Sequence, residues 1–143
     1  MSLRRPLLIG AIIVVLAAAT VVLRPAFTWP VRAPGVATLE RVTLGGTPQW
    51  ILIRGRNAAN PIVLFLHGGP GMPTMYLAHA FQRALEAHFV VVHWDRRGAG
   101  KSYSPGMSPK LMGVTEELSD AEELIRLLLK RFGQRQVILV GHS

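Results

Sequence analysis

The 143-residue chain contains no cysteine, only 7% aromatic residues, and half as many acidic as basic side chains. Without cysteine it has neither disulfide bonds nor a thiolate zinc site, a composition that fits exported and cytosolic proteins equally well. Eight acidic against 16 basic residues give a formal net charge of +8. The basic residues are scattered, with no block of about five or six and no aromatic residues interleaved on a basic patch. We therefore expect no nucleic-acid partner.

Charge is also missing from residues 7–23 (LLIGAIIVVLAAATVVL), whose single polar side chain is that of Thr20. As a helix this segment would rise about 25 Å, near the lower limit for crossing a bilayer. A cleavable signal peptide has a shorter apolar region, of roughly 7 to 15 residues. We predict that residues 1–24 form a retained signal-anchor that enters the membrane through residues 7–23. A cleaved signal peptide and a buried core helix are the alternatives.

Arginines flank the apolar segment on both sides. Arg4 and Arg5, together with the amino terminus, favour an N-terminus inside the cell. The following part of the chain is then expected to be extracytoplasmic, or secreted if the signal is cleaved. Residues 25–35 contain three prolines, which favour extended backbone at and before each proline. We interpret them as a linker that leads to a domain over residues 36–143.

Five short runs rich in apolar and β-branched residues predict strands in this domain. The first two are joined by Gly45-Gly46 and form a candidate hairpin. The last three are apolar on both faces, as expected for buried strands of a covered sheet. Helical patterns separate the later strands, which favours an α/β fold whose sheet is largely parallel after the hairpin. The predicted strands cover residues 36–44, 49–54, 62–66, 89–94 and 136–140.

Two segments between the strands have helical periodicity. Leu77, Phe81 and Leu85 recur every four residues, which predicts a helix over residues 74–88. Ser119-Asp-Ala-Glu122 fits a capping box and predicts the start of a second helix, which Gly133 ends. Acidic residues over 116–123 are interpreted as an electronegative helix start. The apolar face of the second helix comprises Ala121, Leu124, Ile125, Leu128 and Phe132.

Glycine-containing turns follow the last three predicted strands. They are HGGPG at residues 67–71, DRRGAGKS at residues 95–102 and GHS at residues 141–143. Each alone is weak evidence, because glycine-rich turns after strands also form tight loops that bind nothing. All three fall at the carboxyl ends of strands, the edge at which open α/β sheets build active sites. Together they predict a functional site at this edge.

In this order the three turns resemble those of the α/β-hydrolase superfamily, and HGGPG resembles its proline iminopeptidase-like branch. The resemblance covers residues 36–143 and implies the N-terminal part of an α/β-hydrolase sheet, cut at the G-x-S-x-G nucleophile elbow. It makes Ser143 the nucleophile that attacks an ester, amide or peptide and forms an acyl-enzyme. It assigns to Gly69 a backbone N–H of the oxyanion hole. Scaffold positions of the site are His67, Gly68, Pro70, Gly71, Asp95, Arg97, Gly98, Gly100, Ser102 and His142.

Within this resemblance, Asp95 and Arg97 are expected to brace the oxyanion loop through hydrogen bonds; a solvated charged loop is the alternative. Nucleotide binding does not fit residues 98–102 (GAGKS), because the earlier glycine of a phosphate-binding loop is replaced by Asp95 and Tyr103 breaks the dinucleotide pattern. No two histidines have metal-ligand spacing. We expect no nucleotide, no cofactor and no metal. Serine at position 143 also argues against the dehalogenases and epoxide hydrolases of this fold, which use aspartate there.

The histidines of the chain all precede Ser143, whereas the superfamily's order is Ser, then Asp or Glu, then His. The resemblance therefore places the activating partners after residue 143. We expect an N-terminal fragment, inactive by itself, of a serine hydrolase of the aminopeptidase or esterase type. The alternative is a non-catalytic, membrane-associated binding protein on a hydrolase scaffold.

Overall fold

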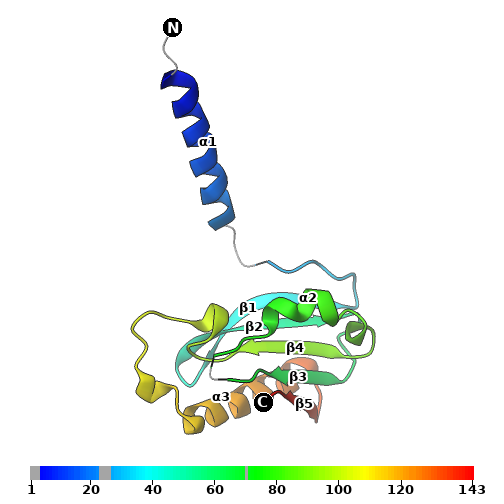
Figure 1. The fold of residues 1–143 in the computed structure, drawn as a ribbon. Helices are drawn as coiled ribbons and strands as arrows, with labels where there is room; N and C mark the ends of the chain where they lie inside the picture. The colour runs from blue at the N-terminus through cyan, green and yellow to red at the C-terminus, as the bar shows by residue number, and fades with distance from the viewer. Residues whose placement is uncertain (1–3, 23–26, 70) are drawn as a thin grey trace.

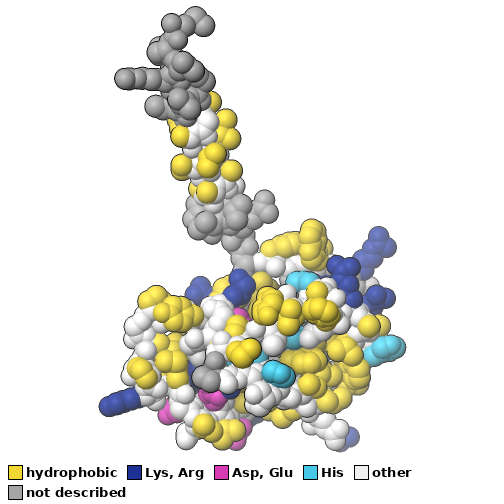
Figure 2. All heavy atoms as spheres, in the orientation of Figure 1, with side chains coloured by type: hydrophobic (Ala, Val, Ile, Leu, Met, Phe, Trp, Pro, Cys, Tyr) yellow, Lys and Arg dark blue, Asp and Glu magenta, His cyan; other side chains and the backbone are white. Residues whose placement is uncertain are grey.

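The computed structural model describes residues 4–22, 27–69 and 71–143, and in the first helix it describes the side chains of residues 9–20. Helix α1 covers Arg4–Val22. Its described apolar side chains, such as Ile13 and Val14, are exposed, and Figure 2 shows them along the helix. Among the described side chains, no helix combines the length and the apolarity needed to cross a membrane. The signal-anchor over residues 1–24 stays a prediction, and its ends, residues 25–26 of the linker, and Pro70 lie outside the described residues.

A five-stranded mixed sheet forms the centre of the domain, in the order β1-β2-β4-β3-β5 (Figure 1). The antiparallel pairs β1–β2 and β2–β4 make its first half, and β3 lies parallel to both β4 and β5. The predicted α/β fold with an initial hairpin is confirmed. The strands are β1 Val36–Leu44, β2 Thr47–Gly55, β3 Ile62–Leu66, β4 Val90–Asp95 and β5 Val137–Gly141.

Helices cover the two faces of the sheet, as Figure 1 shows. Helix α3, Val114–Phe132, packs Leu124 and Leu128 against a cluster that includes Ile53 and Leu64, and all four side chains are buried. Full burial of such a side chain stabilises the fold by roughly 1.5–3 kcal/mol. The opposite face carries Met75 and Ala78, which pack on Leu52 of β2. The domain thus has helix on each side of the sheet.

The single helix predicted over residues 74–88 is wrong. The segment divides into the 3-10 helix η1 Met75–Leu77, the short helix α2 Ala78–Phe81 and the 3-10 helix η2 Leu85–Ala87. Phe81 of the four-residue repeat is 76% exposed, whereas Glu86, which the repeat ignores, is buried. Glu86 turns inward because its carboxylate pairs with the buried Arg54 guanidinium, 2.7 Å away. This ion pair overrides the helical periodicity.

The predicted start of the second helix is also wrong. Helix α3 begins at Val114 after Gly113, one turn and a half before Ser119, and its first turn contains Glu116 and Glu117. Acidic residues there interact favourably with the positive end of the helix dipole. The end at Gly133 is confirmed, since this residue has a φ of +63° in a left-handed cap. The predicted apolar face is confirmed as well.

Strand β5 is more exposed than its apolar sequence predicts. Ile138, Leu139 and Val140 are 47%, 51% and 38% exposed. Strand β5 pairs with β3, and among the described residues no strand lies along its other edge. The prediction of a strand over residues 136–140 is therefore confirmed, but the prediction that this strand is buried is wrong.

Candidate active site

The three glycine-containing turns meet because their strands are parallel and in register. Leu66 of β3 lies opposite both Trp94 of β4 and Gly141 of β5. The pairing continues one residue further, since the His142 N–H donates a hydrogen bond of 3.1 Å to the Leu66 carbonyl. Residues that follow these strands therefore lie at one edge of the sheet. Ser143 lies beside the loop that begins at His67.

Ser143 has a φ of +69°, the one positive φ among the described residues other than glycine. A side chain in this conformation is strained, and such strain is retained chiefly at functional sites. A nucleophile elbow requires this kind of strained turn, because the turn presents the serine hydroxyl at the end of its strand. The φ of Ser143 therefore lies in the left-handed region that such a turn requires.

Gly68 makes room for this turn. A Cβ atom built on Gly68 would lie 2.8 Å from the His142 carbonyl oxygen and 2.8 Å from the Ser143 Cβ. Real Cβ atoms are essentially never found that close, and the backbone oxygen cannot swing aside as a flexible side chain can. Only glycine at this position lets the HGGPG loop approach His142 and Ser143 this closely.

A cavity of about 330 Å³ opens in front of Ser143. The loop supplies one wall of it, and charged side chains from two other elements, Arg96 and Glu117, supply another. The lining residues are His67, Gly68, Gly69, Arg96, Met112, Val114, Glu117 and Ser143. A second cavity of about 320 Å³, lined by Phe27, Met75, Tyr76 and Lys101 among others, does not include Ser143. A substrate that reaches the serine would occupy the first cavity.

His67 is buried, with 4% of its surface exposed, and both ring nitrogens lie against backbone groups. Nδ1 lies 2.8 Å from the Gly68 carbonyl oxygen and therefore donates to it, while Nε2 accepts from the Arg96 N–H at 3.3 Å. This pattern fixes a neutral ring with its proton on Nδ1. Burial is the main cause that lowers the pKa of His67 from its usual value, followed by the effect of neighbours such as Arg96. His67 thus holds the loop in place and has no free nitrogen for a general base.

Arg96 is the side chain of the second turn that contacts the HGGPG loop, the contact that the resemblance leads us to expect of Asp95 and Arg97. The Arg96 Nη2 donates to the Gly68 carbonyl oxygen at 3.3 Å, and Nη1 pairs with the Glu117 carboxylate of α3. The described hydrogen bonds of Arg97 lead elsewhere, to α3 and to the loop before it. Arg96 and Arg97 point in different directions because they are adjacent in a turn. The sequence motif alone does not tell which of the two reaches the loop.

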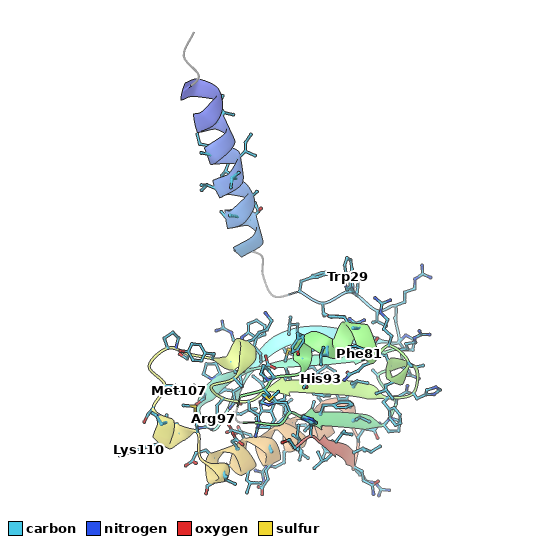
Figure 3. All side chains as sticks on the ribbon, in the orientation of Figure 1. Trp29, Phe81, His93, Arg97, Met107 and Lys110 are labelled. Carbon is cyan, nitrogen blue, oxygen red and sulfur yellow. The ribbon has the colours of Figure 1, made fainter. Side chains whose placement is uncertain are left out.

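Arg97 forms a buried bidentate ion pair with Asp120 of α3. Its Nε and Nη2 each donate to one Asp120 oxygen at 2.6 Å, and both side chains are almost fully buried. The Asp120 carboxylate, as the largest cause, raises the pKa of Arg97 above its usual value. Gln49 completes the network, since its Nε2 donates to Asp120 at 2.6 Å and its Oε1 accepts from Trp94. Figure 3 shows Arg97 on the side of the sheet that α3 covers. This network ties the second turn to β2 and α3.

Asp95 and Ser102 close the second turn on itself. The Lys101 N–H donates to the Asp95 carboxylate at 2.8 Å, and the Ser102 hydroxyl donates to the Asp95 carbonyl oxygen at 2.5 Å. The Ser102 oxygen also accepts from the Trp50 N–H at 2.8 Å, which links the turn to β2. Burial is the main cause that raises the pKa of Asp95. These contacts give Asp95 and Ser102 structural roles within the turn.

The remaining predicted residues are distributed over the three turns. Gly71, Gly98 and Gly100 adopt positive φ angles in the first two turns. The ring of His142 faces the first loop, because its Nδ1 would lie 2.8 Å from a Cβ on Gly68. Among the described residues no backbone hydrogen bond uses the Gly69 N–H. Gly69 itself lines the cavity of Ser143.

Sequence reasoning missed Arg96, Glu117, Asp120 and Gln49. For Asp120 a signal was present, since it lies four and eight residues before Leu124 and Leu128 and so shares their buried face of α3. A carboxylate on a buried helical face requires a paired cation. For Arg96 and Glu117 no such signal exists, because their contact depends on how α3 meets the turn in space.

Comparison with known proteins agrees with this geometry. The model of the alpha/beta hydrolase family matches residues 63–143. A probable aminopeptidase from Bacillus subtilis (strain 168) is 39% identical over 108 residues, which cover 76% of this chain and 34% of that protein. The chain therefore spans about a third of the length of this curated relative.

Solved structures give the same result. The proline iminopeptidase-related protein from Thermus thermophilus is 29% identical with a TM-score of 0.61, over 75% of this chain and 36% of that one. An epoxide hydrolase from Vigna radiata is 28% identical with a TM-score of 0.59, over 75% of this chain and 32% of that one. Sequence match, strand order and the three turns all lead to one assignment. The chain belongs to the alpha/beta hydrolase family, in its proline iminopeptidase-like branch.

Proposed function

We propose that the complete protein, meaning the product of the whole gene, is a serine hydrolase in which Ser143 attacks the carbonyl carbon of an ester, amide or peptide. The observation that carries the proposal is the φ of +69° at Ser143. The close approach of Gly68 and the cavity in front of the serine support it further. A nucleophile elbow needs a serine in a strained turn, beside an open cavity at the carboxyl edge of the sheet, and Ser143 meets these requirements.

The proposed reaction proceeds through an acyl-enzyme. As the Ser143 oxygen bonds to the carbonyl carbon, its proton passes to a general base, and the carbonyl oxygen gains negative charge. The Gly69 N–H donates to this oxyanion. The leaving amine or alcohol takes the proton when the tetrahedral intermediate collapses, and water then hydrolyses the acyl ester. Loss of one oxyanion donor typically slows such reactions by about a hundredfold or more.

The general base is expected in the part of the relatives that this chain does not span. His67 uses both ring nitrogens in backbone contacts, so it is not the base. The superfamily's chain order places the carboxylate and the histidine of the triad after the nucleophile. The 143-residue chain by itself is therefore expected to be inactive.

An aminopeptidase that releases N-terminal residues is the preferred activity, because the named relatives are a probable aminopeptidase and a proline iminopeptidase-related protein. An esterase is the second candidate, supported by the apolar Met112 and Val114 in the lining of the cavity. An epoxide hydrolase is disfavoured, because Ser143 occupies the nucleophile position.

A substrate panel separates the two candidates. The complete protein should hydrolyse peptide amides with a free N-terminal proline or alanine, and lose this activity when the amino group is acetylated. Preference for p-nitrophenyl esters, with no effect of a free amino group, would favour the esterase. If Ser143→Ala retains full activity on both classes, the proposed nucleophile is wrong.

We also propose that residues 7–23 anchor the protein to a membrane, with the domain outside the cytoplasm. The linker is fixed to the domain, since Arg54 donates to the Thr28 hydroxyl at 2.7 Å and to the Trp29 carbonyl oxygen at 2.6 Å. Trp29, labelled in Figure 3, is exposed, and tryptophan side chains favour the membrane interface. In a membrane preparation washed with carbonate, the protein should stay in the pellet. Its release into the supernatant would overturn the anchor.

A further inference from the structure

The carbonyl group of Gly68 is the most heavily bonded backbone group of the oxyanion loop. His67 Nδ1 donates to its oxygen at 2.8 Å, Arg96 Nη2 at 3.3 Å and the Met72 N–H at 3.3 Å. Three donors from the loop and from the turn after β4 thus fix the direction in which this carbonyl points.

This carbonyl shares a peptide unit with the Gly69 N–H. A peptide bond is planar and almost always trans, so the C=O and N–H of one unit point in opposite directions. Any contact that fixes the Gly68 carbonyl therefore also fixes the Gly69 N–H. The groups that bond to the Gly68 carbonyl oxygen therefore determine the direction of the Gly69 N–H, the donor expected for the oxyanion.

Arg96 is the one charged group among these three donors. Its guanidinium lies close to the loop, since a Cβ on Gly69 would lie 2.9 Å from Nη2. Glu117, in the first turn of α3, pairs with the other side of the guanidinium. The side chains of Arg96 and Glu117 are 18% and 29% exposed, so solvent screens the pair only in part. Glu117 therefore connects the start of a rigid helix, through Arg96, to the loop.

We propose that Arg96, held by Glu117, is a positioning residue that orients the Gly68–Gly69 peptide so that the Gly69 N–H faces the carbonyl oxygen of the substrate attacked by Ser143. The proposal rests on the proposed function. Arg96 acts through the loop and does not bond to the reacting atoms. Loss of the pair should affect the transition state, where negative charge develops, more than the binding of the uncharged substrate.

The test compares, in the complete protein, two ion pairs that each include a glutamate of helix α3. Arg96→Gln and Glu117→Gln remove the proposed pair. Arg126→Gln and Glu122→Gln remove the exposed Arg126–Glu122 pair, whose side chains are 70% and 69% exposed. We expect kcat to fall about tenfold or more in the first set, with KM within about threefold of wild type, and no change in the second set. Arg96→Lys, which keeps a positive donor, should recover part of kcat.

Amide hydrogen exchange of the peptide that contains residues 67–72 provides a second readout. Exchange should be faster in Arg96→Gln and Glu117→Gln than in wild type and in the control set. The proposal is overturned if kcat and exchange match wild type, or if KM changes while kcat does not. If Arg96→Gln fails to fold, Glu117→Gln decides, because it leaves the guanidinium in place. If the wild-type protein shows no hydrolysis that is lost in Ser143→Ala, the proposed function is wrong. The hydrogen-exchange measurement would still decide whether Arg96 holds the loop.

Discussion

A Cβ atom built on Gly68 would lie 2.8 Å from the Cβ of Ser143, so the HGGPG loop and the end of β5 are in direct contact. The two residues are 75 positions apart in the sequence. Parallel pairing of β3 with β5 brings them together, and the absence of a side chain at Gly68 allows the contact. The proposed nucleophile and the loop expected to hold its oxyanion donor therefore depend on each other for their positions.

Gly68→Ala should remove the reactivity of Ser143 in the complete protein. The added methyl group meets backbone atoms of His142, so either the loop or the elbow has to move. We expect the rate of modification by a fluorophosphonate to fall by about a hundredfold or more, the usual effect of losing an oxyanion donor. The labelling rate is measured by mass spectrometry over time, and Ser143→Ala, which cannot be labelled at this position, gives the background. A labelling rate equal to wild type would refute the close contact.

Asp120→Ala should destabilise the protein strongly, because it leaves the buried Arg97 guanidinium unpaired and removes an acceptor of Gln49. Breaking a buried ion pair from one side typically costs about 3–5 kcal/mol. Glu122→Ala on the same helix is the matched control, since it removes an exposed ion pair that contributes at most about 1 kcal/mol. Urea unfolding measures the free energy of unfolding of both variants. Equal losses in the two variants would contradict the structural role of the Arg97–Asp120 pair.

Stability should fall as the pH is lowered from about 6.5 to about 4, and His93 is one cause. Burial, and after it the nearby His79, lowers the pKa of His93 to about 4. The ring stacks on Phe65 and bonds to Gln82, so the folded state keeps it neutral. In this pH range the unfolded chain binds a proton that the folded protein does not. Each pH unit therefore costs about 1.4 kcal/mol, and the loss ends below the folded pKa.

His93→Gln tests this, because it removes the titrating ring and keeps an N–H donor for Gln82. The free energy of unfolding of the variant should depend less steeply on pH between 6.5 and 4. The pKa of His67 and that of His79 are also lowered, chiefly by burial, and add to the trend in both proteins. The difference between the two proteins therefore isolates His93. His88→Gln, at an exposed position, is the control and should follow wild type. Parallel curves for wild type and His93→Gln would contradict the prediction.

Local sequence was sufficient for much of the fold and of the site. Apolar runs predicted all five strands because the alternation and β-branching are local properties, and Gly133 predicted a helix end for the same reason. The three turns predicted one edge, since parallel strands bring their carboxyl ends together. The pairing of buried charged side chains could not be predicted. Helical periodicity places Asp120 on the buried face of α3, but no local pattern tells that Arg97 pairs with it, or that Arg54, distant in sequence, pairs with Glu86.

The 143-residue chain expressed alone should associate through β5. Leu139 is 51% exposed on this strand, and an exposed apolar strand at a sheet edge pairs readily with other chains. Leu139→Lys should raise the fraction that elutes as a monomer in size-exclusion chromatography. Leu111→Lys, at a position 46% exposed outside the strands, should leave that fraction unchanged. A similar gain in both variants would mean that added charge, and not the strand edge, controls solubility.

The most direct test of the nucleophile is covalent labelling of the complete protein with a fluorophosphonate. A serine in the strained conformation of Ser143, with an oxyanion donor beside it, should bond to phosphorus and displace fluoride. The account predicts one adduct per chain, located by peptide mass spectrometry on Ser143, with none in Ser143→Ala. A folded complete protein that shows no adduct, or an adduct on another serine that persists in Ser143→Ala, would contradict the account.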